Sequence, residues 1–156
     1  MARIARLASL ATLLIATAAL VACGGDNSEK NRYIDELTDA QMRFTSTQER
    51  FEADAEKSST SRENSRALAR FATAIADTVT ALRGIDAPPQ VEAEHRRFVG
   101  VFQTWHDDVT RFAAAIRDPT PKAFERARRR IAAATDTFNR SSREAATQID
   151  AKLENT

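Results

Sequence analysis

The sequence predicts an all-α protein, and three observations support that fold class. Glycine and proline are scarce, with four of each among 156 residues, so the residues that most often end helices are few. Apolar residues recur every three or four positions over four long segments, which is the spacing of one face of a helix. The strict alternation that indicates a half-buried strand is absent. We therefore expect four helices in an antiparallel up-down-up-down bundle.

The first two helices are expected over residues 30–57 and 61–83. Thr60 and Glu63 have the spacing of a capping box, which places the start of the second helix directly after Thr60. Gly84 is expected to end that helix in the left-handed conformation. The apolar stripes are Tyr33, Leu37, Ala40, Phe44, Thr47 and Phe51 in the first helix, and Leu68, Phe71, Ile75, Val79 and Leu82 in the second.

Proline-containing turns delimit the last two helices. Pro89 suits the first position of a helix over residues 89–117, and Thr120 with Pro121 suits the start of a helix over residues 121–153. The third helix carries a heptad seam sustained over four repeats. The seams are Val91, His95, Phe98, Phe102, Trp105, Val109, Phe112 and Ile116 in the third helix, and Phe124, Ala127, Ile131, Ala134, Phe138, Ser141, Ala145 and Ile149 in the fourth.

The segment before these helices has the pattern of an export signal. Arg3 and Arg6 form a basic start, and residues 7–21 are uncharged and largely apolar. This apolar run is shorter than the roughly 20 residues that a membrane span needs. It ends in Leu20-Val21-Ala22-Cys23, which resembles the lipobox of bacterial lipoproteins. The resemblance covers the first two dozen residues, and it implies cleavage before Cys23, diacylglycerol attached to its sulfur and acylation of the new amino group.

The resemblance divides the chain into three parts. Residues 1–22 are then a signal peptide, residues 23–29 are the lipidated cysteine with a short polar tether, and residues 30–156 are the bundle. Two or more acyl chains hold a protein stably on a membrane. We therefore expect an anchor on the extracytoplasmic face, either periplasmic or on the outer surface. The alternative is an ordinary or uncleaved signal segment with an unmodified cysteine, which is the only cysteine in the sequence.

Composition argues against several classes of function. The chain has 23 basic and 22 acidic residues, and removing Arg3 and Arg6 with the signal peptide leaves 21 and 22. A nearly neutral body argues against a nucleic-acid-binding protein. The sequence has no Gly-x-Ser-x-Gly elbow, no glycine-rich phosphate loop and no haem-attachment motif. We therefore expect neither an enzyme nor a bound cofactor.

The two histidines, His95 and His106, are candidate metal ligands. Glu92 and His95 form one Glu-x-x-His, which is half of the pattern that holds two metals in ferritin-like proteins. The sequence has no second copy, so no metal site is expected. His95 is expected to bond a carboxylate, with Glu92 one turn away, or to be partly hydrated. His106 is expected to be solvated and not to form a dyad with Asp107, since adjacent helical residues point apart.

Two groups of residues are candidate contact sites. His95, Phe98, Phe102 and Trp105 could line a cavity for an apolar ligand, although aromatic residues at seam spacing usually form core. The second group is a basic cluster made of Arg126, Arg128, Arg129 and Arg130. It could contact anionic headgroups, wall polymer or an acidic partner, and the alternative is a solvated face with local ion pairs. Gly100, within a helix, is expected to mark the close approach of another helix or a partner.

The sequence thus favours a lipid-anchored, non-enzymatic interaction or structural module. Such a module would present its helix faces to an envelope protein, a wall polymer or another copy of itself. The alternative is an extracytoplasmic binding protein for a small apolar ligand near Trp105. An enzyme or metal carrier that uses Glu92 and His95 is the least favoured hypothesis.

Overall fold

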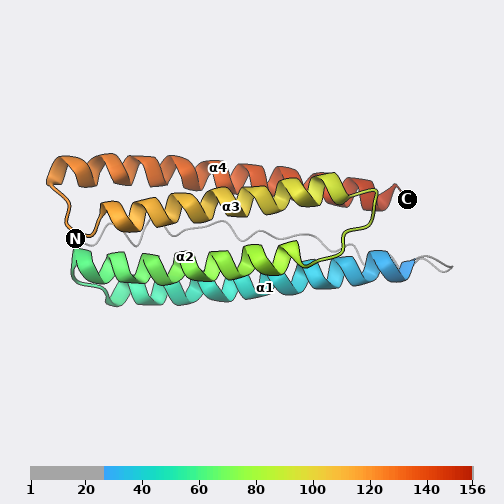
Figure 1. Ribbon diagram of the computed structural model, residues 1–156, viewed down its shortest axis with the longest axis horizontal. Helices are drawn as coiled ribbons and strands as arrows, with labels where there is room; N and C mark the ends of the chain where they lie inside the picture. The colour runs from blue at the N-terminus through green and yellow to red at the C-terminus, as the bar shows by residue number, and fades with distance from the viewer. Residues whose placement is uncertain (1–26, 156) are drawn as a thin grey trace.

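The protein is an all-α bundle of four helices in the computed structural model, which describes residues 27–155. The helices are α1 (Asn27–Lys57), α2 (Ser61–Arg83), α3 (Glu92–Ala115) and α4 (Pro121–Glu154). They lie side by side along one long axis (Figure 1). The predicted fold class is confirmed. The predicted signal peptide, the lipobox and Cys23 lie outside the described residues.

Neighbouring helices run in opposite directions (Figure 1). The Ser65 hydroxyl, near the start of α2, donates a 2.7 Å hydrogen bond to the carbonyl of Ala113, near the end of α3. At the other end of the bundle, the ammonium group of Lys30 in α1 bonds the carbonyl of Leu153 in α4. The bundle therefore has an N-terminal end, where α1 begins and α4 finishes, and an opposite end, where α4 begins.

A layer of four phenylalanines, one from each helix, lies in the core. The ring of Phe44 in α1 lies 6.4 Å from Phe71 in α2, 5.0 Å from Phe102 in α3 and 6.0 Å from Phe138 in α4. Such ring pairs add about 0.5–1.5 kcal/mol each beyond the apolar area that they bury. All eight predicted seam positions of the third helix are buried. The heptad prediction for that helix is therefore confirmed.

Polar caps begin α2 and α4 as predicted. The Thr60 hydroxyl accepts a 3.2 Å hydrogen bond from the Glu63 amide, and the Glu63 carboxylate accepts a 3.0 Å bond from the Thr60 amide. The Thr120 hydroxyl accepts a 3.3 Å bond from the Ala123 amide, with Pro121 in the first turn of α4. These bonds satisfy amides that have no partner within the helix.

Three predicted helix boundaries were wrong. Helix α1 begins at Asn27, so the tether expected over residues 23–29 is helical in its last three positions. Glu29 lies in the first turn, where a negative charge interacts favourably with the helix dipole. Helix α3 begins at Glu92 and not at residue 89, because the Val91 amide donates a 2.9 Å bond to the Pro88 carbonyl and holds a separate turn. It ends at Ala115, two residues earlier than expected.

Two further details, one at a helix end and one within α4, also differ from expectation. Gly84 is right-handed, with φ −80° and ψ −10°, so the predicted left-handed cap is absent at that position. In α4 the fully buried serine is Ser142 and not Ser141. The Ser142 hydroxyl donates a 2.7 Å hydrogen bond to the Phe138 carbonyl, which lets it be buried without losing a partner.

Candidate functional site

His95 is buried in the core, and both of its ring nitrogens are bonded. Nε2 lies 2.9 Å from the Leu82 carbonyl oxygen, and Nδ1 lies 3.1 Å from the Tyr33 hydroxyl. A carbonyl only accepts, so Nε2 carries the proton and Nδ1 accepts from Tyr33. Burial lowers the pKa of His95, which favours the neutral ring. The expected bond to a carboxylate was wrong, since Glu92 pairs with Arg96.

Acidic groups surround Tyr33 at the N-terminal end of the bundle. Burial, together with the nearby carboxylates of Asp150 and Glu94, raises the pKa of the Tyr33 hydroxyl. One Glu94 oxygen lies 2.9 Å from the Lys152 ammonium group, and the other is buried with no hydrogen-bond partner among residues 27–155. Burial raises the pKa of Asp150, and the charge of Glu154 raises it further. These groups come from three helices, and the Glu94–Lys152 ion pair links α3 to α4.

The aromatic residues expected to line a ligand cavity are packed as core. Phe98, Phe102 and Trp105 are each at most 4% exposed, and Trp105 stacks on Phe138 at 5.3 Å. Phe98 and Phe102 border a cavity of about 20 Å³ that reaches the surface between α1 and α4. That volume holds about one water molecule. The Trp105 indole nitrogen is buried and has no hydrogen-bond partner among the described residues.

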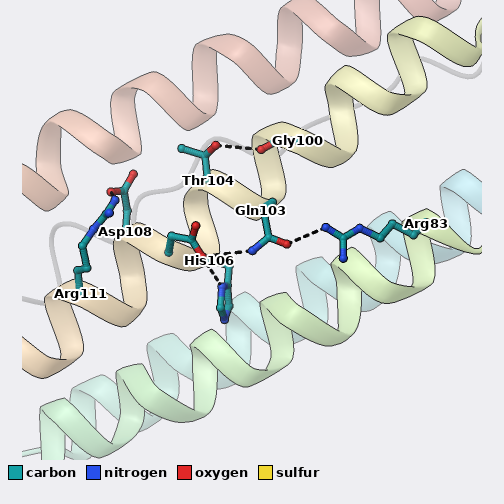
Figure 2. A network of polar contacts seen from close by, with 8 residues as sticks. Arg83, Gly100, Gln103, Thr104, His106, Asp108 and Arg111 are labelled. Atoms are coloured by element: carbon teal, nitrogen blue, oxygen red, sulfur yellow. Dashed lines mark hydrogen bonds and ion pairs between the residues drawn. The ribbon is translucent and has the colours of Figure 1, made fainter.

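A polar network joins α2 and α3 at the surface (Figure 2). Arg83 donates a 3.0 Å bond to Gln103, and Gln103 donates a 3.2 Å bond to Asp107. Asp107 also accepts a 2.9 Å bond from Nδ1 of His106, and this bond lowers the pKa of Asp107. The expectation that His106 and Asp107 would not pair was therefore wrong. The two side chains are long enough to bend toward each other although their Cα–Cβ bonds diverge.

This network has the carboxylate and imidazole of a hydrolytic triad but not its nucleophile. Among residues 27–155, no serine, threonine or cysteine side chain is bonded to His106. Asp107 and Gln103 instead connect the imidazole to Arg83 on the neighbouring helix. The geometry therefore fits a surface link between α2 and α3.

Gly100 borders this network, and no other helix of the described chain approaches it closely. The Thr104 hydroxyl donates a 3.0 Å bond to the Gly100 carbonyl (Figure 2). A Cβ atom added to Gly100 would meet no heavy atom within 4 Å, and the residue is exposed. The prediction that another helix packs against Gly100 was wrong.

The basic cluster of α4 lies at the end of the bundle opposite the start of α1. Arg126, Arg129 and Arg130 are exposed and have no ion pair or hydrogen bond among the described residues. Arg128 is half-buried and donates a 3.1 Å bond to Glu125. Three of the four guanidinium groups are thus unpaired among the described residues, and that of Arg128 forms a local ion pair.

Comparisons with known proteins give no family for this chain. No protein-family model, no curated protein and no solved structure matches it. None of the helices in the described part of the chain is long and apolar enough to cross a membrane. Within residues 27–155, no three histidine, cysteine or acidic side chains are arranged to hold a metal ion.

Proposed function

We propose that the chain is a lipid-anchored, non-enzymatic interaction module of the bacterial cell envelope. The anchor is proposed from the likeness of Leu20-Val21-Ala22-Cys23 to a lipobox. The absence of catalysis is proposed because His95 bonds Tyr33 of α1 and Leu82 of α2, and His106 bonds Asp107 of its own helix, with no serine, threonine or cysteine nucleophile bonded to either ring among the described residues. The partner is an acidic component of the envelope, either a protein or a wall polymer. The position of the unpaired arginines on α4 carries this proposal.

The basic cluster is too far along the bundle to serve the membrane that holds the anchor. Cys23 lies four positions before the start of α1, so an anchor there would adjoin the N-terminal end. Arg130 precedes Glu154 by 24 positions, which at a rise of 1.5 Å per residue is about 36 Å of helix. Charges are screened over about 8 Å at physiological salt. If the long axis of the bundle is perpendicular to the anchoring membrane, the cluster faces a partner away from that membrane.

Charge reversal combined with crosslinking tests this proposal. Arg126, Arg129 and Arg130 would all be changed to glutamate in the protein at native abundance, and crosslinked products would be compared in intact envelopes. The matched control reverses Arg43, Arg50 and Arg140, which are also exposed and give the same change in net charge. The first variant should lose its crosslinked partner, and the control should keep it. Equal crosslinking by the two variants contradicts a role for the cluster.

Binding of a small apolar ligand near Trp105 is a second candidate. It is favoured by the cavity that borders Phe98 and Phe102. A ligand larger than water requires α1 and α4 to separate, because the cavity volume is about 20 Å³. A ligand should then change Trp105 fluorescence in the wild-type protein and not in Phe102→Ala. Identical fluorescence changes in both proteins contradict this candidate.

A further inference from the structure

A groove lies between α3 and α4, close to the end of the bundle where α4 begins. Its volume is about 110 Å³, several times that of the cavity between α1 and α4. Its floor is apolar and is formed by Phe112 and Ala115 of α3 and by Ala127, Ile131 and Ala134 of α4. It is therefore a hollow in an otherwise well-packed seam.

Small side chains create this groove. Ala127 and Ala134 are seven residues apart on the inward side of α4, where larger residues would fill the space between two helices. Ala115 leaves similar room on α3. Ala127 and Ala134 are only half-buried, in contrast to Ala145 further along the same seam. The groove thus follows directly from the choice of alanine at these positions.

The rim of the groove is charged. Arg111 bonds Asp108 on the α3 side, so those two charges largely compensate. Arg130 lines the groove on the α4 side and has no charged partner among the described residues. Arg126 and Arg129 lie within one turn of it and add positive charge. The unbalanced charge at the mouth is therefore positive, which favours an anion.

We propose that the groove binds a small amphipathic anion, with an aryl or short alkyl group on the apolar floor and a carboxylate at Arg130. Binding sites for small molecules commonly combine an apolar lining with a few polar groups that orient the ligand. An engineered cavity of about 150 Å³ holds benzene, so a groove of 110 Å³ that is open on one side has room for most of an aryl ring. This site goes beyond the proposed function and does not depend on lipidation.

Titration of the full-length protein with sodium benzoate tests the proposal by amide NMR. Benzoate should produce saturable shifts at Phe112 and Ile131, which lie on the two sides of the groove. Benzyl alcohol has the same ring without the charge and should bind more weakly, by about fivefold, the scale of an exposed ion pair worth roughly 1 kcal/mol. Shifts that do not saturate, or equal affinity for the two probes, overturn the proposal.

Two pairs of variants assign the site. Ala134→Leu fills the groove and should abolish the shifts, whereas Ala133→Leu, on the exposed side of the same turn, should not change them. Arg130→Gln is a surface change that should weaken benzoate binding about fivefold. Its control, Arg129→Gln, should change affinity by less than twofold. Wild-type affinity in Arg130→Gln, or in folded Ala134→Leu, overturns the assignment.

Discussion

The hydroxyl of Tyr33 in α1 donates a 3.1 Å hydrogen bond to Nδ1 of His95 in α3. The two residues are 62 positions apart in the sequence. The opposite ring nitrogen of His95 bonds the carbonyl of Leu82, in the last turn of α2. One imidazole therefore connects three helices at the N-terminal end of the bundle. Because Tyr33 is fully buried, water cannot replace the bond if either partner is removed.

Replacing Tyr33 by phenylalanine should destabilise the bundle while preserving its fold. The substitution leaves Nδ1 of His95 buried without a donor, which costs about 1–3 kcal/mol. Chemical denaturation would measure the loss of unfolding free energy. Met42→Ala, at the exposed methionine of α1, is the control and should change the unfolding free energy by less than about 0.5 kcal/mol. A Tyr33→Phe protein as stable as the wild type would show that the bond contributes nothing to stability.

The bundle should lose stability in mild acid because of His95. Burial lowers the pKa of His95 below its ordinary value of 6.5, so the unfolded chain binds a proton at a higher pH than the folded protein does. Stability contributed by the neutral ring is complete above pH 6.5 and is lost as pH falls from there toward the folded-state pKa. Unfolding free energies measured between pH 7.5 and pH 5 should therefore decline.

Variants at the two histidines separate the sources of this decline. His95→Gln should be less stable than the wild type at every pH and should lose most of the slope in this range. His106→Gln should keep the slope, because His106 lies in the surface network and not in the core. If the slope persists in His95→Gln and disappears in His106→Gln, the pH dependence of stability comes from His106 and the attribution to His95 is wrong.

Gly100→Ala should stabilise α3. The residue is exposed in the interior of the helix, and an added Cβ would meet no heavy atom within 4 Å. Alanine is favoured over glycine in such positions by about 0.5–1 kcal/mol. Thermal unfolding should show a higher midpoint for the variant. A lower midpoint would mean that the absence of a side chain at Gly100 serves a contact that the folded monomer lacks.

Local patterns in the sequence predicted most of the fold. Apolar residues that recur every three or four positions predicted all four helices. The pairs Thr60 with Glu63 and Thr120 with Pro121 predicted where α2 and α4 begin. Such signals are read between residues that are close in the chain. The start of α3 was misplaced because Pro89 is compatible with both a first helical turn and a separate turn, and only the Val91 bond to Pro88 distinguishes them.

The polar sites were less predictable because they depend on contacts between distant segments. No local rule links Tyr33 to His95, although both occupied predicted stripe positions at the same end of an antiparallel bundle. That shared depth is the signal that could have paired them. The groove also had a signal, since Ala127 and Ala134 repeat at seven residues beside Ile131. The volume of the groove depends on how α3 packs against α4, and the spacing of residues within one helix does not predict that packing.

The intact mass of the mature protein isolated from its native membrane tests the proposed lipid anchor most directly. The mature chain should begin at Cys23, with a mass increased by diacylglycerol on the sulfur and by a further acyl group on the new amino terminus. In Cys23→Ser that increase should be absent, and residues 1–22 should remain attached. A wild-type chain with an unmodified Cys23, or with residues 1–22 still present, would contradict the anchor and with it the proposed place of the bundle in the envelope.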